Sequence, residues 1–423
     1  MRISVVGGGY VGLVSSACFA ELGHSVDIIE IDERKVEAIN SGKPPIYEKG
    51  LEELLSKHVG SNLRAITGYD NVRNTDLSFI CVGTPSGPDG SADLSMVETA
   101  SRSIGESLKE RVGYHVVVVK STVPPGTTQN LVMSTVLMNS GGIREKLGFA
   151  MNPEFLREGL AVHDFMHPDR IVIGSSEAKA RDLVESAYNG LNAPIVRVGL
   201  SAAEMTKYAS NALLATKISF SNEIGNICKK MCIDVYEVMR GVGMDHRISP
   251  HFLNAGAGFG GSCFPKDVMA MIRLGEMLGE DPVLLKSVIE VNERQPLRMV
   301  ELLENRIGSL FGKEIAVLGL AFKNDTDDVR DSRAVPVIKE LKSKGARIRA
   351  YDPLAASNMR GIIPDIEYCE SAAGALKKAD ACLIMTEWPE FGQLDEEFDL
   401  MRSRVIIEGR NILLCEDAEG ICW

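Results

Sequence analysis

The chain has 423 residues, enough for two or three domains of ordinary size. Its apolar content is 45%, and its formal net charge is −12 without a long basic run. A nucleic-acid partner is therefore not expected, because binding a phosphate backbone needs clustered Lys and Arg. A small anionic ligand is compatible with this charge, because a local pocket can be positive on an acidic protein.

The cysteines and the apolar runs bear on the compartment. Cys18, Cys81 and Cys382 lie in apolar runs, where a buried and inert thiol is the default. Cys228 and Cys232 are four residues apart without a second pair, so no metal site is expected. The N-terminus lacks the pattern of a signal peptide, and no apolar run reaches the ~18 residues of a membrane span. We therefore expect a cytoplasmic protein without a membrane partner.

A glycine-rich turn lies between two predicted strands near the N-terminus. An apolar strand at 3–6 leads into Gly7, Gly9 and Gly12, which have the G-x-G-x-x-G spacing, and a helix and a second strand at 25–29 follow. This order is typical of a βαβ unit that binds a dinucleotide. The first glycine permits the turn, the second lets the backbone approach a pyrophosphate, and the third lets helix and strand pack closely.

The second strand ends at Glu30, about 20 positions beyond the glycines. Its carboxylate would accept hydrogen bonds from an adenosine ribose and would repel a 2′-phosphate, so NAD is favoured over NADP. Arg34 and Lys35 lie just downstream and weaken this preference slightly. A glycine-rich turn without a function is the alternative.

Further strands are predicted within residues 77–85, 115–128 and 170–175, each followed by a loop rich in Thr, Pro or Gly. Ligands of open parallel sheets bind outside the carboxyl ends of the strands. Thr84 and Thr122 are therefore placed to line a cofactor cleft, although either residue could equally serve a turn or a cap.

Residues 201–243 contain few helix breakers and predict one long helix of about 40 residues, straight or kinked. Such long helices often form subunit interfaces. Lys207 and Asn211 are four residues apart and share a face of this helix, and Asn222 returns close to the same face about three turns later. A polar site and a solvated stripe explain this pattern equally well.

Residues 313–353 again predict strand, loop, helix and strand. Ala321 and Phe322 stand where an open phosphate loop would need glycine, so this βαβ unit is degenerate. We therefore predict an α/β protein in which two Rossmann-like, doubly wound parallel-sheet domains, 1–200 and 301–423, are joined by a central long-helix domain, 201–300.

Residues 258–267, GFGGSCFPKD, place Cys263 behind a run of glycines, with Lys266 and Asp267 shortly after it. Together with GGGYVGL, STVPPGTT, NPEFLREG and AFKNDTDDVRDS, this stretch resembles the UDP-glucose/GDP-mannose dehydrogenase family over nearly the whole chain. Residues 252–267 look most like the UDP-glucose branch of that family. The resemblance implies NAD-dependent four-electron oxidation of the C6 alcohol of UDP-glucose to UDP-glucuronate, with two NAD molecules consumed per turnover.

The resemblance also implies a reason for the cysteine. The Cys263 thiolate would trap the intermediate aldehyde as a thiohemiacetal, loss of a second hydride would give a thioester, and water would release the acid. Gly260 and Gly261 would let the thiol approach the sugar. The resemblance implies further catalytic roles. Lys207 and Asn211 would stabilise oxygen anions, Asp267 with Thr122 would hold or activate a water, and Glu154 would act as the base.

Cofactor contacts follow from the same resemblance. Glu158 would lie near the nicotinamide, and it would share a face with Glu154 if the segment is helical. A charge role at a helix N-terminus is the alternative for Glu158. Lys266 would reach the NAD phosphates or lower the pKa of Cys263, and Arg330 would reach NAD from the third domain. The expected cofactor residues are Gly7, Gly9, Tyr10, Val11, Gly12, Glu30, Lys35, Thr84, Thr122, Glu158, Lys266 and Arg330.

For the substrate, Arg247 resembles an arginine that crosses from a neighbouring subunit, which implies at least a homodimer. Lys323 resembles a ligand of the UDP phosphates, and Phe259 would lie near the uridine, with core packing as its alternative. The expected substrate residues are Glu154, Phe155, Leu156, Lys207, Asn211, Asn222, Arg247, Phe252, Leu253, Asn254, Ala255, Gly256, Phe259, Gly260, Phe322, Lys323 and Arg410.

Three other functions stay open. A sibling enzyme would oxidise GDP-mannose or an N-acetylated UDP-hexose. A two-electron dehydrogenase would stop at the aldehyde or ketone and would not need Cys263. A non-catalytic nucleotide-sugar sensor would share the fold, but such proteins usually lose the nucleophile or its lysine, and this chain has both Cys263 and Lys207.

Overall fold

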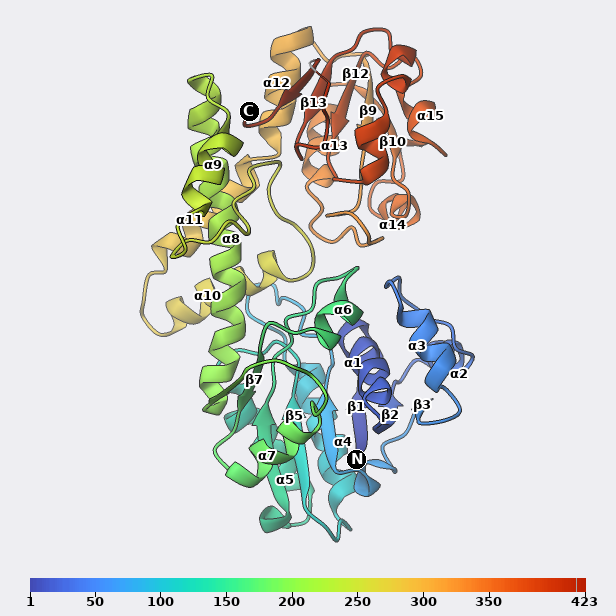
Figure 1. Ribbon diagram of the computed structural model, residues 1–423, viewed down its shortest axis with the longest axis vertical. Coiled ribbons are helices and arrows are strands. Elements are labelled where there is room, and N and C mark those ends of the chain that lie inside the picture. The colour runs from blue at the N-terminus through green and yellow to red at the C-terminus, as the bar shows by residue number, and fades with distance from the viewer. Residues whose placement is uncertain (416) are drawn as a thin grey trace. The chain divides into compact units, whose positions relative to one another are not determined.

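The computed structural model describes residues 1–415 and 417–423, and Figure 1 shows its helices and strands. The chain divides into two compact units, Met1–Ser210 and Asn211–Trp423. The predicted division into three domains at 200 and 300 is a different partition and stays a prediction.

The first unit contains an eight-stranded sheet in the order β3-β2-β1-β4-β5-β6-β7-β8. All neighbours pair in parallel except β6 and β7, which meet antiparallel through Met151 and Gly174. The strand order reverses between β1 and β4, which is the switch point at which such sheets bind dinucleotides. The strands are β1 Arg2–Val6, β2 Ser25–Ile29, β3 Leu63–Ile66, β4 Leu77–Ile80, β5 His115–Val119, β6 Leu147–Met151, β7 Ile171–Gly174 and β8 Ile195–Val198.

Helices cover both faces of this sheet. In β5, Val116 and Val118 pack into one core while Val117 and Val119 pack into another, and all four are fully buried. A strand buried on both faces reads as a continuous apolar run, and each such valine contributes about 1.5–3 kcal/mol. The helices are α1 Tyr10–Glu21, α2 Glu33–Asn40, α3 Leu51–His58, α4 Ser95–Leu108, α5 Ser134–Asn139, α6 Ala161–Met166 and α7 Ala178–Ser186, with a π-helix at Thr128–Met133 before α5.

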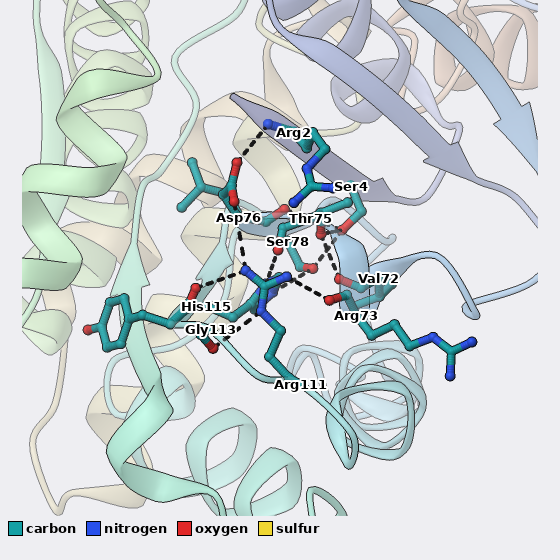
Figure 2. Close-up of polar contacts among 12 residues, drawn as sticks. Arg2, Ser4, Val72, Arg73, Thr75, Asp76, Ser78, Arg111, Gly113 and His115 are labelled. Carbon is teal, nitrogen blue, oxygen red and sulfur yellow. Dashed lines mark hydrogen bonds and ion pairs between the residues drawn. The ribbon is translucent and has the colours of Figure 1, made fainter.

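A buried polar layer lies at the amino end of β5 (Figure 2). The imidazole of His115 is 2.8 Å from the carbonyl oxygen of Thr75 and 2.9 Å from Oγ of Ser78. Arg111 donates to the carbonyl oxygens of Arg73 and Tyr114, at 2.6 and 3.0 Å. Burial lowers the pKa of His115 to about 4. This layer lies at the opposite end of the strands from the glycine loop.

The predicted helix at 201–243 is wrong in its length. Helix α8 spans Leu200–Lys230, and a separate helix, α9, spans Val235–Gly243. Between them Cys232 has φ 56°, and the side chain of Asp234 caps α9 by accepting from the Tyr236 amide. A left-handed residue followed by an N-cap ends one helix and starts the next.

The second unit contains an all-parallel six-stranded sheet in the order β11-β10-β9-β12-β13-β14. This order reverses between β9 and β12 as it does in the first sheet, so the predicted second Rossmann-like sheet is confirmed. Its strands are β9 Glu314–Leu318, β10 Arg347–Tyr351, β11 Glu367–Tyr368, β12 Ala381–Ile384, β13 Ile406–Glu408 and β14 Ala418–Gly420. Its further helices are α10 Phe264–Met277, α11 Val283–Arg294, α12 Leu297–Ile307, α13 Ala334–Ser343, α14 Ala356–Arg360 and α15 Ala372–Leu376.

The buried cysteines agree with the sequence analysis. Cys18, Cys81 and Cys382 are buried as expected, and across the described part of the chain all nine cysteines are thiols. In the same part of the chain, no helix combines the length and the apolar character that crossing a bilayer requires.

Candidate active site

The glycine loop between β1 and α1 has two glycines that the fold requires and one that it leaves open. Gly7 has φ 104°, and a Cβ there would lie 2.8 Å from the carbonyl oxygen of Cys81. A Cβ at Gly12 would overlap the carbonyl oxygen of Gly7. Around Gly9, no described atom lies within 4 Å of where a Cβ would be. The open position is the one at which a pyrophosphate would approach the backbone.

Glu30 lies beside this loop, at the carboxyl end of β2. Its side chain is buried and accepts hydrogen bonds from the amides of Gly8 and Asp32, both at 3.0 Å. An ionised carboxylate has about four acceptor positions, so two remain for ribose hydroxyls. This geometry is compatible with the NAD preference that the sequence predicts.

Asp352 follows β10 in the second unit, in the position that Glu30 has after β2. Its buried carboxylate accepts five hydrogen bonds from the protein itself: from the amides of Leu320, Ala321, Leu354 and Ala355 at 2.7 to 2.9 Å, and from the indole of Trp388 at 3.1 Å. Its acceptor positions are thus filled by the protein, which explains why this βαβ unit keeps its topology without an open phosphate loop. This residue was not predicted from the sequence, although an acid after the second strand was the available signal.

Glu154 and Lys207 form a buried ion pair in the first unit. Nζ of Lys207 lies 3.0 Å from Oε1 of Glu154, and the two residues are 3% and 7% exposed. Oε2 of Glu154 accepts from the Leu156 amide at 2.5 Å, and the Phe155 ring lies 5.4 Å from the Lys207 ammonium. The structure therefore brings these predicted residues together.

The segment that carries Glu154 and Glu158 is not helical, so the condition for a shared face is not met: residues 152–157 have no regular structure, and 158–159 form a turn. Pro153 disfavours helix in the residue before it, and Gly159 has φ 82°. Glu48, which the sequence analysis missed, accepts from the amides of Gly159 and Ala161 at 2.7 and 2.8 Å. It therefore supplies negative charge at the start of α6, and it also accepts from the hydroxyl of Tyr10.

A buried lysine fixes the chain just before Glu154. Nζ of Lys120 donates to Oδ1 of Asn152 and to the hydroxyl oxygen of Tyr188, both at 3.1 Å, and Lys120 is 3% exposed. The amide of Asn152 in turn donates to the Val172 carbonyl oxygen at 2.9 Å. Lys120 was not predicted from the sequence, although a lysine at the end of the apolar run HVVVVK was a visible signal.

Thr84 and Thr122 meet in the loops beyond β4 and β5, where the sequence predicts ligand-binding residues. Oγ1 of Thr84 donates to the carbonyl oxygen of Thr122 at 2.9 Å. Thr84 therefore also helps to set the loop that carries Thr122. The downstream Lys35 is partly buried on α2, and Asp32 caps that helix by accepting from the Arg34 amide at 2.9 Å.

In the second unit, Cys263 immediately precedes α10 and is partly exposed. Asp267, on the first turn of that helix, is 1% exposed. Oδ2 of Asp267 accepts from the amide of Asn211 at 2.6 Å, and Oδ1 accepts from Nζ of Lys266 at 2.7 Å. Three predicted site residues thus form one polar cluster, with Asn211 on α8 and with Lys266 and Asp267 on the helix that begins after the thiol.

The glycines before Cys263 are required by packing within the second unit. A Cβ at Gly260 would overlap the carbonyl oxygen of Asp331. Gly261 has φ 82°, and a Cβ there would lie 2.7 Å from the Phe322 ring. The Gly261 amide donates to the Arg330 carbonyl oxygen at 2.9 Å. The loop at 322–331 therefore lies against the cysteine loop, and the predicted approach of the thiol to a sugar stays a prediction.

Residues 252–256, the predicted uridine-binding stretch, are hydrogen-bonded to Asn222 of α8. Oδ1 of Asn222 accepts from the Gly256 amide at 2.7 Å, and its buried Nδ2 has no hydrogen-bond partner among the described residues. Phe252 has φ 64°, Leu253 and Ala255 are buried, and Asn254 is exposed. Asn222 thus holds the backbone that is predicted to bind the base.

The other predicted substrate and cofactor residues lie in varied surroundings. Phe259 is buried in an apolar cluster with Val268 and Ile272, which favours the packing alternative for its ring. Arg410 donates to the carbonyl oxygens of Met385 and Gly258, and the Lys323 ammonium lies 5.9 Å from the Phe322 ring. Two arginines are largely exposed and pair with aspartates two residues away: Arg247 with Asp245 and Arg330 with Asp328.

Comparison with known proteins decides the family. Residues 1–192 match the model of the NAD binding domain of the UDP-glucose/GDP-mannose dehydrogenase family, residues 201–294 match its central domain, and residues 316–414 match its UDP binding domain. The chain belongs to the UDP-glucose/GDP-mannose dehydrogenase family. The predicted resemblance, the oxidoreductase class and the NAD cofactor are thereby confirmed.

Relatives of the family match over nearly the whole chain. UDP-glucose 6-dehydrogenase AglM of Haloferax volcanii is 48% identical over 98% of this chain and 97% of its own length. UDP-glucose 6-dehydrogenase TuaD of Bacillus subtilis is 45% identical over 99% of this chain and 91% of its own length. The solved UDP-glucose dehydrogenase from Pyrobaculum islandicum superposes with a TM-score of 0.95 at 45% identity, covering 100% of this chain and 98% of that one.

Proposed function

We propose that this dehydrogenase oxidises the C6 alcohol of UDP-glucose to the carboxylate of UDP-glucuronate, through a thiohemiacetal and a thioester on Cys263. The observation that carries this proposal is the thiol just before α10, whose first turn carries Lys266 and Asp267, with Asp267 hydrogen-bonded to Asn211 of α8. The UDP-glucose 6-dehydrogenases at 45–48% identity favour UDP-glucose over the sibling substrates.

The overall reaction consumes one UDP-glucose, two NAD⁺ and one water and forms UDP-glucuronate, two NADH and three protons. Bound NAD supplies the hydride acceptor for both oxidations. In the proposed sequence, sulfur of Cys263 adds to the carbonyl carbon of the aldehyde after the first oxidation. After the second oxidation the C–S bond is that of a thioester. Water adds to its carbonyl carbon, the C–S bond breaks, and the thiolate is regenerated.

Negative charge on the sulfur has support from the fold. Cys263 is the residue immediately before α10, and a helix N-terminus favours an anion. A thiolate at such a position is a better nucleophile than a neutral thiol at neutral pH.

Lys207 and Asn211 are the proposed donors to the oxygen atoms that become negative during the reaction. They lie one turn apart on α8 and share a face of that helix. In the first unit, the Lys207 ammonium is desolvated and fixed by Glu154, so it needs little reorganisation. A preorganised donor of this kind lowers a barrier by about 3–4 kcal/mol. Glu154 and the Asp267–Thr122 pair stay the proposed base and water-holding residues.

Assembly as a homodimer is also part of the proposal. Within the second unit α8 exposes Leu213, Phe220 and Ile227 at intervals of seven residues, each more than half exposed. An apolar stripe at this spacing follows one face of a helix and favours contact with a second copy. Sedimentation equilibrium would test this, with Phe220→Asp expected to shift the mass toward that of one chain.

The decisive experiment is to measure NADH formed per UDP-glucose consumed, with GDP-mannose and UDP-N-acetylated hexoses in parallel. Two NADH per UDP-glucose, together with UDP-glucuronate, support the proposal. One NADH with an aldehyde or ketone product would establish the two-electron dehydrogenase, and binding without NADH would establish the sensor. A higher kcat/KM for GDP-mannose or an N-acetylated sugar would establish the sibling specificity.

A further inference from the structure

Glu204, on the first part of α8, is fully buried and surrounded by hydrogen-bond donors. Its Oε2 accepts from the Gly126 amide at 2.6 Å. Its Oε1 accepts from the amide of Thr128 at 2.7 Å and from the hydroxyl of Thr128 at 2.6 Å. Both oxygens act as acceptors, which suits the ionised carboxylate, because that form accepts on both oxygens and donates on neither.

This carboxylate is held in a place where its charge is costly. Burial raises the pKa of Glu204, and the three hydrogen bonds from Thr128 and Gly126 act in the opposite direction. A buried charge persists in a fold only where hydrogen bonds compensate its desolvation. The cluster therefore depends on all three donors, and the loss of one acceptor would weaken it.

Thr128 is the first residue of the π-helix at Thr128–Met133, and Gly126 lies in the turn before it. The first amides of a helix lack partners within the helix, and a nearby side chain usually caps them. Here Thr127 stands at the cap position without a side-chain cap bond, and Glu204, 76 residues away from Thr128, provides the acceptors. Glu204 therefore caps the π-helix and also connects it to α8.

Each of the two connected elements carries a residue of the proposed reaction. The loop before the π-helix carries Thr122, and α8 carries Lys207 less than one turn after Glu204. Lys207 is itself paired with Glu154. We propose that Glu204 is a positioning residue that holds the Thr122 loop in register with the turn of α8 that presents Lys207.

This inference rests on the proposed function, because it assigns a purpose to the placement of Thr122 and Lys207. Its central test is the Glu204→Gln variant, which keeps the shape but turns an amide NH₂ toward one of the donors. Hydrogen–deuterium exchange measures, without any substrate, whether Glu204 stabilises the segment that contains Gly126 and Thr128. Steady-state kinetics with UDP-glucose and NAD measures the effect of this stabilisation on the reaction.

We expect faster amide exchange in residues 126–133 of Glu204→Gln. Amide exchange in the strands of the sheet should be unchanged. We expect kcat to fall by about 10- to 100-fold, because small misplacements of reacting groups have effects of this size. KM for UDP-glucose should change by less than about twofold, since binding contacts are kept. The matched control is Glu110→Gln, whose side chain is 78% exposed and which should change neither measurement.

Unchanged exchange in residues 126–133 would show that Glu204 does not stabilise this segment. Faster exchange with unchanged kcat would refute the positioning role. If Glu204→Gln fails to fold, Thr128→Val removes one donor and should give the same two effects at smaller size. In the double variant the two kcat effects should be less than multiplicative, because both act on one cluster. A wild-type chain that forms no NADH from UDP-glucose refutes the proposed function. The exchange data would still show whether Glu204 stabilises residues 126–133.

Discussion

Nζ of Lys207 lies 3.0 Å from Oε1 of Glu154, and both side chains are almost inaccessible to solvent. This pair joins the start of α8 to the irregular segment after β6. A buried pair of this kind presents a charged donor with a fixed direction, but it also makes each partner depend on the other.

Removing one partner should therefore affect both activity and stability. We expect Lys207→Met to lower kcat by about 10²–10³-fold through the loss of an oxyanion donor. It should also lower the free energy of unfolding by about 3–5 kcal/mol, because Glu154 loses its buried counter-charge. Steady-state kinetics and urea unfolding measure these effects. Lys57→Met is the control, since its ammonium is 60% exposed and pairs with Glu21 at the surface; equal effects in both variants would contradict the argument.

The acid after β2 should control the choice between NAD and NADP. We expect Glu30→Ala to lower the ratio of kcat/KM for NAD to that for NADP at least about tenfold, because repulsion of the 2′-phosphate is removed. Asp352→Ala is the control, since that acid is buried and occupied by protein donors in the second unit. It should lower stability and leave the cofactor ratio unchanged. An unchanged ratio in Glu30→Ala would argue against the ribose role.

The thiol of Cys263 should be needed for acid formation but not for cofactor binding. We expect Cys263→Ala to lose at least about 10³-fold in UDP-glucuronate formation, as expected for the loss of a nucleophile, while NAD binding stays within a few-fold. Product analysis and NADH fluorescence titration measure the two properties. Cys369→Ala removes another partly buried thiol and should keep full activity. Full turnover by Cys263→Ala would refute the covalent scheme.

Gly260 should be needed for the packing of the cysteine loop itself. In Gly260→Ala the new methyl group meets the Asp331 carbonyl oxygen, so we expect a loss of about 1–3 kcal/mol in unfolding free energy and a lower kcat. Gly241→Ala is the matched control, because no described atom lies within 4 Å of the new Cβ and the residue is within α9. It should be neutral or stabilising. A Gly260→Ala variant as stable as wild type would show that the loop at 322–331 can move away.

His115 should make stability depend on pH. Its folded-state pKa is lowered to about 4, below the unfolded value of about 6.5, so the unfolded chain binds more protons between these values. Stability from the neutral imidazole is present above pH 6.5 and is lost as the pH falls toward 4. We expect a loss of about 2 kcal/mol between pH 8 and pH 5, measured by urea unfolding.

The loss should be absent in His115→Gln when it is compared with wild type over the same range. The control is His246→Gln, whose ring is 94% exposed and whose removal should leave the pH dependence unchanged. An identical slope in wild type and His115→Gln would assign the pH dependence to other groups.

Much of the fold follows from patterns that are local in the sequence. The apolar runs and the glycine spacing of residues 3–29 specify the first βαβ unit, because strand burial and close helix packing need those residue types at adjacent positions. The second βαβ unit was visible for the same reason, and its loss of an open phosphate loop was visible from Ala321 and Phe322. The break after Lys230 was missed, since helix propensity alone does not exclude the left-handed Cys232.

The family, the cofactor and the order of the candidate residues were thus determined by the sequence alone, because they depend on motifs a few residues long. Only the tertiary structure decided how those residues are held. The hydrogen bonds between Thr128 and Glu204, between Gly159 and Glu48, and between Lys120 and Asn152 join positions 32 to 111 residues apart. Such contacts leave no periodic pattern in the chain, since the partners become neighbours only when the sheet and its helices have packed.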